Sequence, residues 1–395
     1  MAAYLLDWAS LLIRWVHLIT GIAWIGASLY FVFLDDSLEK PKNPADSAKG
    51  VAGELWAVHG GGFYHAQKYA AAPPAMPETL HWFKWEAYWT WISGFTLLVL
   101  LYYLGAGLYL IDKSVLDLSQ GAAVGIGLAW LVAGWVVYDL LCKSPLGRND
   151  AALGVVMFLV LCAAAWGLTK TFSGRGAYIH YGAILGTIMV ANVVMVIIPG
   201  QRKWVRALAE GHAPDPGTGA RAKQRSVHNT YFTLPVLFVM ISNHYAMTFG
   251  SAWSWLVLIG FTAAGALIRV WFVLRHKGNA SPAPLAAGVA ILLAMAVLLA
   301  PRLQEGAPAA KFSEVAGIID ARCATCHAKK PTFQGFAEPP KGVTFESPER
   351  IRAFAAQIRQ QAVVAKAMPP GNLTQMTDEE RKAIDQWFLA GAKTD

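Results

Sequence analysis

The chain has 395 residues, of which 55% are hydrophobic and only 15% are charged, and it contains 16 tryptophans. This composition is too apolar and too aromatic for an ordinary soluble enzyme and indicates that most of the chain lies in lipid. The net charge of +8 comes mainly from basic loops between apolar runs, so it does not indicate a nucleic-acid partner.

Several apolar runs approach or exceed about 20 residues, whereas a buried parallel strand lasts only about 4 to 8. They predict an all-α fold in which residues 1–300 form a polytopic transmembrane helix bundle. We expect eight spans, the sixth interrupted by Pro235 and the eighth short. They are Leu11–Leu34, Tyr88–Leu110, Ala122–Leu141, Ala151–Leu168, Tyr178–Ile198, Val227–Tyr245, Trp253–Leu274 and Leu285–Leu299.

Basic residues predict the orientation of these spans. The loops after odd-numbered spans are rich in Lys and Arg, whereas those after even-numbered spans contain only Lys113, Lys170 and Arg175. Cytoplasmic loops carry an excess of Lys and Arg. We therefore expect a multi-pass protein of the cell membrane with both termini outside the cytoplasm.

The first span has a stripe of unusual residues on one helix face. Arg14, His17, Gly21 and Trp24 recur at helical spacing, and a glycine between a histidine and a tryptophan leaves room for a flat ring. Ionisable groups are costly in a membrane, so Arg14, His17 and Trp24 are candidate catalytic residues. The alternative is a tightly packed helix pair that uses Gly21 and Gly26, with His17 bonded to a neighbouring carbonyl group.

The loop at residues 35–84 is long for a connection between helices, which favours a functional segment. Its part from Glu54 to His65 combines aromatic residues, His59, His65 and three consecutive glycines, whose backbone can approach a ligand. We take His59 and His65 as further candidate catalytic residues. An interfacial helix broken by a flexible hinge is the structural alternative.

Polar residues within the later spans have more than one interpretation. Asn192 and Asn243 are typical of interhelical hydrogen bonds. Asp139 and Arg269 lie toward the inner face, where they could pair with each other, or Arg269 could bind an anion.

After the last span the composition changes. Residues 301–311 are rich in Pro and Ala and read as a linker, and residues 312–395 form a separate small helical domain. The segment Cys323-Ala-Thr-Cys326-His327 has the spacing at which two thioethers and one imidazole hold a single haem. A redox dithiol or half of a zinc site is the alternative, but no second Cys-x-x-Cys follows.

A second axial iron ligand is expected downstream. Met368 precedes two prolines and a glycine, and this stiff loop suits a fixed ligand, whereas Met376 is the competitor and reads as a core residue. Ser347-Pro348 opens one helix and Thr377 to Glu380 forms a capping box for the last, in which Trp387 should pack inward. The two signatures around His327 and Met368 resemble those of small class I cytochromes c. His/Met ligation raises the potential, so the tail is expected to accept electrons.

Three histidines lie in or near the outer half of the predicted bundle. His17, His180 and His244 could meet, and two of them could hold a second, non-covalent haem b or line a polar substrate pocket. Separate interfacial histidines are the simpler alternative.

The whole chain resembles the bacterial membrane-bound, cytochrome-c-linked urate oxidases (urate hydroxylases). The resemblance is carried by Arg14 to Gly26, by Gly53 to His65 and by the haem tail. The first-helix pattern alone is also similar to membrane proteins of copper uptake and protoporphyrinogen oxidation. The resemblance implies purine catabolism in the bacterial inner membrane, with the cytochrome domain in the periplasm.

The resemblance also implies a reaction. Urate would be oxidised to 5-hydroxyisourate with a hydroxyl group from water, and the electrons would pass through haem c to a cytochrome c or a terminal oxidase. Two functions of other classes stay open: a b/c-type electron relay that oxidises quinol, and a transporter with a redox-sensing cytochrome tail.

Overall fold

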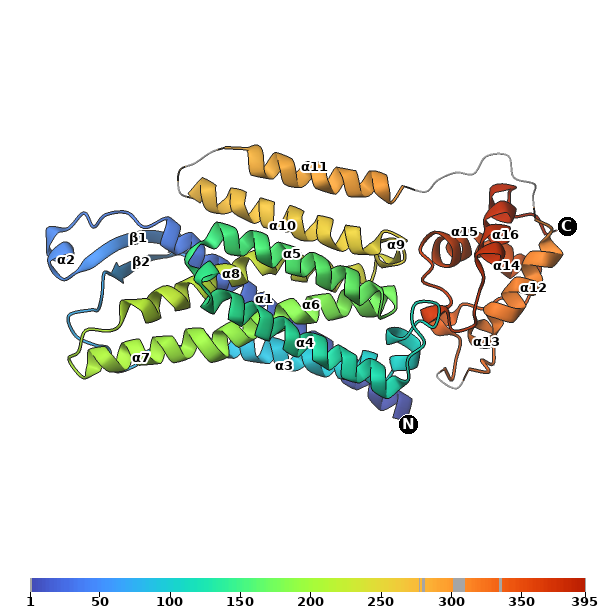
Figure 1. Cartoon of the computed structure of the whole chain (residues 1–395), viewed down its shortest axis with the longest axis horizontal. Helices are drawn as coiled ribbons and strands as arrows, with labels where there is room; N and C mark the ends of the chain where they lie inside the picture. Colours follow the sequence, from blue (N-terminus) through green and yellow to red (C-terminus); the bar gives the residue numbers. More distant parts are fainter. Residues whose placement is uncertain (1, 277, 279–280, 301–309, 334–335, 395) are drawn as a thin grey trace. The chain divides into compact units, whose positions relative to one another are not determined.

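The computed structural model describes residues 2–276, 278, 281–300, 310–333 and 336–394, and it is predominantly helical (Figure 1). Most of the predicted linker, residues 301–309, therefore lies outside the described residues. In the first part of the chain the elements are α1 (Ala2–Asp36), α2 (Pro44–Ala48), β1 (Val51–His59), β2 (Gly62–Tyr69), α3 (Trp85–Leu98), η1 (Val99–Tyr103), η2 (Ala106–Leu110), α4 (Gln120–Lys143), η3 (Pro145–Arg148), α5 (Asp150–Thr169), α6 (Gly174–Ala191), η4 (Asn192–Ile197), α7 (Ile198–Ala209), α8 (Pro216–Ser242), α9 (Ala246–Phe249), α10 (Ser254–His276) and α11 (Ala283–Leu298). The tail contains α12 (Phe312–Arg322), α13 (Ala324–His327), η5 (Pro340–Gly342), α14 (Pro348–Ala353), α15 (Ala355–Ile358), η6 (Arg359–Val364), η7 (Pro370–Asn372) and α16 (Asp378–Leu389).

The chain divides into two compact units. Unit 1 consists of residues 1–97, 183–237 and 262–291, and unit 2 consists of residues 98–182, 238–261 and 292–395. The helices α3, α6, α8, α10 and α11 contribute residues to both units.

Five helical segments among the described residues are long and apolar enough to cross a membrane. They are Tyr4–Asp36, Gln120–Lys143, Asp150–Thr169, Gly174–Ala209 and Ser254–His276. The other three predicted spans are helical, but none of them is a single helix that is both long enough and apolar enough to cross a membrane by these criteria. The second is divided among α3 and the π-helical segments η1 and η2, the sixth lies in α8, whose first half is polar, and the eighth corresponds to the shorter apolar helix α11.

The prediction that the fold is all-α was wrong for the loop after α1, which forms a β-hairpin. Strands β1 and β2 pair antiparallel, with His59 opposite Gly62. Gly60 and Gly61 make the two-residue turn, and both have positive φ, of 57° and 80°. Such turns require φ above zero at both central positions, which glycine adopts without strain. The glycines therefore close a turn, and neither the hinge nor an interfacial helix is present there.

The hairpin is attached to the segment that follows α1. Glu39 pairs with Glu54 through backbone hydrogen bonds of 2.9 Å in each direction. Gly53 makes this approach feasible, because a Cβ atom at that position would lie 2.9 Å from the Cβ of Leu38. The side chain of Glu54 is buried and accepts a hydrogen bond of 3.0 Å from the backbone N–H of Lys42.

Small residues also set the helix contacts within unit 1. A Cβ at Gly265 of α10 would lie 3.2 Å from the ring of Pro235 in α8, so the glycine accommodates the proline that interrupts the sixth predicted span. A Cβ at Gly288 of α11 would lie 3.2 Å from the carbonyl oxygen of Ala264 in α10. Close backbone approach at small residues is typical of helix packing in membranes.

The tail of unit 2, coloured orange to red in Figure 1, has its own hydrophobic core. Val315 and Ile319 of α12 pack with Ile384 and Trp387 of α16, and Trp387 is 2% exposed, as predicted. The predicted caps are also confirmed. The side chain of Ser347 caps α14, and Thr377 and Glu380 form the reciprocal capping box of α16.

We expect the Gly53→Val substitution to loosen the hairpin. Its new side chain would overlap Leu38, and overpacking of this kind costs about 1–3 kcal/mol. Hydrogen exchange of the β1 and β2 amides in the detergent-solubilised protein should therefore accelerate. Ala52→Val is the matched control, since Ala52 is exposed on the same strand. Equal protection in both variants would contradict this account of Gly53.

Candidate functional site

The Cys323 to His327 motif lies where α12 ends and the short helix α13 begins. The Nδ1–H of His327 donates a hydrogen bond of 3.0 Å to the carbonyl oxygen of Val343. This bond fixes the tautomer and the orientation of the ring and leaves Nε2 as a lone-pair donor. The ring of Phe345 lies 5.2 Å from the imidazole, centroid to centroid. The imidazole is therefore oriented as an iron ligand requires.

Both cysteines of the motif are partly buried. Burial raises the pKa of the Cys323 thiol to about 12 and also raises the pKa of the Cys326 thiol. The two groups are therefore protonated and partly shielded from water, which disfavours a reactive redox dithiol. Two thiols within one turn of an oriented imidazole fit the donor set for covalent haem attachment.

The two candidate methionines differ in their surroundings. Met376 is 3% exposed and packs in the hydrophobic core of the tail, which confirms its interpretation as a core residue. Met368 is only partly buried and is followed by Pro369, which is itself followed by a second proline. The thioether of Met368 is therefore the one that does not pack in the hydrophobic core.

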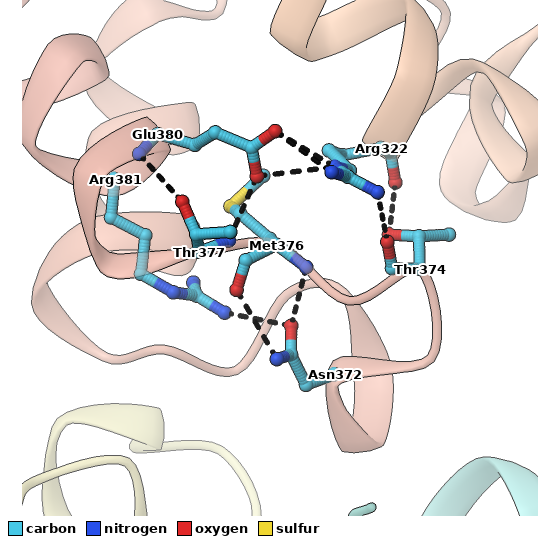
Figure 2. A network of polar contacts seen from close by, with 7 residues as sticks. All are labelled: Arg322, Asn372, Thr374, Met376, Thr377, Glu380 and Arg381. Atoms are coloured by element: carbon cyan, nitrogen blue, oxygen red, sulfur yellow. Dashed lines mark hydrogen bonds and ion pairs between the residues drawn. The ribbon is translucent and has the colours of Figure 1, made fainter. Parts of the chain in front are cut away.

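Buried Arg381 holds the loop of Met368 in place. Its Nη1–H groups donate to the carbonyl oxygens of Ala362 and Met368, the latter over 2.9 Å. Its Nη2 donates to the Oδ1 of Asn372 over 3.1 Å, and Asn372 also bonds the backbone of Met376 in both directions (Figure 2). Burial lowers the pKa of Arg381. One guanidinium thus connects η6, the Met368 loop and the approach to α16.

A second arginine connects the haem motif to the same loop. Arg322 directly precedes Cys323, donates to the carbonyl oxygen of Thr374 over 2.6 Å and forms an ion pair with Glu380 at 2.9 Å (Figure 2). Within unit 2 the loop continues to Gly371, where φ is 54° and the backbone lies against the carbonyl oxygen of Ile111, just after η2. The segments that carry His327 and Met368 are thus tied together.

The stripe on α1 makes contacts typical of helix packing. The Nδ1–H of His17 donates to the carbonyl oxygen of Thr90 over 3.0 Å, and its ring lies directly on Gly94 of α3. Trp24 packs on a cluster that includes Ala87 and Val190, whereas Arg14 is exposed and bonds Ser10 of its own helix. The bond from His17 to a neighbouring carbonyl group is the one that the helix-pair alternative predicts, although a Cβ at Gly26 would meet nothing within 4 Å. The catalytic role of the three residues stays a prediction.

His180 and His244 of unit 2 have different environments. His180 is fully buried, donates from Nδ1 to the carbonyl oxygen of Gly176 over 2.8 Å and accepts at Nε2 from the hydroxyl of Tyr103 over 3.2 Å. Gly127 of α4 lies against Nε2, where a Cβ would come within 2.6 Å. His244 is exposed after the end of α8. The surroundings of His180 leave no room for a porphyrin at its Nε2, so they do not fit a haem b there.

Of the hairpin histidines, His65 is engaged and His59 is exposed at the turn. The Nε2–H of His65 donates to the Oε2 of Glu54 over 2.9 Å, and its ring stacks on Trp56 at 4.1 Å between centroids. The backbone N–H of Lys42 and, to a smaller extent, His65 hold the pKa of Glu54 below its usual range, against the effect of burial. These contacts stabilise the hairpin, and a catalytic role for His59 or His65 stays a prediction.

Unit 1 contains two clusters of polar side chains that the sequence predicted only in part. Asn192 donates to Asn229 over 2.9 Å, as expected for an interhelical bond, and the buried Arg225 donates to Asn192 over 3.3 Å. The second cluster contains Arg269, which is 6% exposed, together with Asp36 and His276. Asp139 forms an ion pair with Lys143 at 2.6 Å, one turn along α4. The sequence signal for Arg269 was its charge within an apolar span.

Residues 3–300 match a protein family described as urate oxidase N-terminal. No curated protein and no solved structure matches the chain. The match covers well over half of the chain and ends before the tail.

We expect the Gly94→Ala substitution to separate α1 from α3. The added Cβ would lie 2.8 Å from the Cε1 of His17, so the ring and its bond to Thr90 must shift, at a cost of about 1–3 kcal/mol. The thermal midpoint of the purified protein in detergent should fall. Gly26→Ala is the matched control on α1, because a Cβ there meets nothing within 4 Å. A midpoint as high as that of the control would rule out this contact.

Proposed function

Because the chain belongs to the urate oxidase N-terminal family, we propose that it is a membrane-bound oxidoreductase that oxidises urate and passes the electrons to a haem c on its own tail. Membership of this family supports an enzyme that acts on urate. Five helices long and apolar enough to cross a membrane are compatible with a protein embedded in a lipid bilayer.

The observation that carries the proposal is the attachment of a haem motif to a urate oxidase domain in one chain. The family match ends at residue 300, and the Cys323 to His327 motif follows within the same polypeptide. A urate oxidase that reduced oxygen directly would have no need of such a tail. The combination therefore supports transfer of electrons from urate to an acceptor within the protein.

The tail residues fit haem c. Cys323 and Cys326 would hold it through thioether bonds, His327 would ligate the iron through Nε2, and Met368 would supply the second axial ligand. When bound, haem c supplies a one-electron acceptor whose potential is raised by the thioether ligand. Val343 fixes the imidazole of His327, and Arg381 fixes the backbone of the Met368 loop. Preorganised ligands keep the coordination of the iron unchanged between its two oxidation states.

The proposed reaction balances as a hydroxylation by water. The urate monoanion and one water molecule give 5-hydroxyisourate, one proton and two electrons. The tail accepts one electron at a time, so each urate requires two successive transfers to an external acceptor such as a soluble cytochrome c or a terminal oxidase. The backbone of Gly371, in the loop after Met368, lies against Ile111 within unit 2. That contact favours transfer of electrons to the tail of the same chain.

We further propose that the chain crosses a bacterial inner membrane eight times, with both termini in the periplasm. The excess of Lys and Arg in the loops after odd-numbered spans supports this orientation. The environment of His180 does not fit a haem b at that residue, so the proposal places none there. A pyridine haemochrome spectrum of the purified protein should contain haem c.

We expect urate to reduce the tail without oxygen. Anaerobic addition of urate to the oxidised, haem-loaded protein should produce the absorption bands of reduced haem c, with two haems reduced per urate. Product formed in ¹⁸O-labelled water should contain the label. A protein with Cys323→Ala and Cys326→Ala should carry no covalent haem and show no such reduction.

Reduction by quinol but not by urate would contradict the proposed function and support the electron relay. Urate transport into proteoliposomes without any change at the haem would instead support a transporter with a redox-sensing tail.

We expect the Arg381→Met substitution to release the Met368 loop. Without the guanidinium, the carbonyl groups of Ala362 and Met368 and the amide of Asn372 lose a shared donor, at about 1–3 kcal/mol for each buried group left unpaired. The absorption band of methionine-ligated ferric haem should weaken and the midpoint potential should fall. Arg359→Gln, which breaks the ion pair with Asp385 in the same domain, should lower stability but keep the band. Equal spectra in the two variants would show that Arg381 does not position Met368.

A further inference from the structure

Unpaired polar atoms are concentrated at one place in unit 1. Among the described residues, the buried side-chain nitrogen and oxygen atoms without a hydrogen-bond partner are Asp36 Oδ2, Arg269 Nε, Arg269 Nη2, His276 Nδ1 and Thr325 Oγ1. All but the last belong to three neighbouring residues of unit 1. Buried polar groups are nearly always hydrogen-bonded in native proteins, so such a concentration requires a cause.

Two transmembrane helices bring these residues together. Asp36 is the last residue of α1, and Arg269 and His276 lie seven positions apart on α10, which places them on the same face two turns apart. His276 Nδ1 is 3.9 Å from Asp36 Oδ2, and the ring of Phe33 stands edge-on to that of His276 at 6.0 Å. Asp36 and Tyr231 of α8 are close enough to interact electrostatically with the guanidinium of Arg269.

The unpaired atoms of Arg269 share one edge of the guanidinium group. The N–H of Nε and one N–H of Nη2 point in the same direction and form the fork that binds planar anions in a bidentate manner. A guanidinium stays charged in proteins, so burial cannot be relieved by loss of a proton. Asp36, the carboxylate nearest to this charge, lies beside His276 and makes no hydrogen bond to the fork.

The other arginines of unit 1 that lie near polar groups are already paired. Arg225 is also buried but donates to Asn192 within a hydrogen-bonded network. Arg221 lines a hollow with Lys203 and Trp204, but it is exposed and bonds Asp215 and Thr218. Arg275, one residue before His276, is exposed and lies over the ring of Trp271. Arg269 is thus the buried cation with a donor edge that is not used within the described part of the protein.

We propose that Arg269, with Asp36 and His276, binds a planar purine monoanion. The inference rests on the proposed function, since urate is a planar monoanion at neutral pH. The fork of Arg269 donates two N–H groups to one oxygen and nitrogen edge of the anion. Asp36 accepts from a ring N–H of the purine, and His276 offers Nδ1 to its polar rim. The ring of Phe33 provides aromatic surface beside His276.

The test is binding of urate to the full-length, haem-loaded protein after reduction with dithionite, which prevents turnover. Equilibrium dialysis measures the dissociation constant for urate. We expect Arg269→Gln to weaken binding at least tenfold, because two charge-assisted hydrogen bonds are lost. Arg269→Lys, which keeps the charge but not the fork, should recover only part of the affinity. Arg275→Gln on the same helix should bind like the wild type.

Correct folding of each variant is checked by its covalent haem content and its elution in size-exclusion chromatography. If Arg269→Gln does not fold, His276→Gln and Asp36→Asn serve in its place, each expected to weaken urate binding at least threefold. Wild-type affinity in a folded Arg269→Gln variant, or in both replacements, would overturn the site while leaving urate oxidation intact. Failure of urate both to bind the wild type and to reduce its haem would instead overturn the proposed function.

Discussion

The structure depends on one constraint, which is that polar groups placed inside an apolar helix bundle must find partners within the protein. Apolar surroundings offer no hydrogen bonds, so each unpaired donor or acceptor buried in them is destabilising. The contacts of His17 with Thr90 and of His180 with Gly176 and Tyr103 meet this requirement. His17 and His180 thus have hydrogen-bond partners within the protein, and a buried group without a partner is the more informative one.

The same constraint works differently in the tail, where the residues of the proposed haem c site are fixed by paired groups. The bond from His327 to Val343 uses one ring nitrogen and thereby presents the other. Arg381 is buried and fully engaged, and its partners are the backbone of the very loop that contains Met368. A metal ligand must be held in a fixed position, whereas a substrate site needs polar groups that are not already hydrogen-bonded within the protein.

Structural features that depend on short sequence patterns could be predicted from the sequence. The caps at Ser347 and Thr377 and the burial of Trp387 each depend on spacing within a few residues, and the apolar runs mark the long helices. The hairpin was missed because three glycines beside two histidines suggested a ligand loop, although two consecutive glycines also satisfy a tight turn. The association of Asp36 with His276 joins residues 240 positions apart, and no local pattern encodes it.

The charge of the substrate connects these observations. A neutral ligand could enter an apolar bundle without a fixed counter-charge. A purine anion instead requires a buried cation that the fold already holds in place. Arg269 is such a cation, because it is only 6% exposed and burial keeps water from competing for the fork. Oxidation of the urate monoanion by water also releases a proton, and the carboxylate of Asp36 and the imidazole of His276 in the proposed site are groups able to accept it. The cluster therefore matches both the charge of urate and the proton balance of its oxidation.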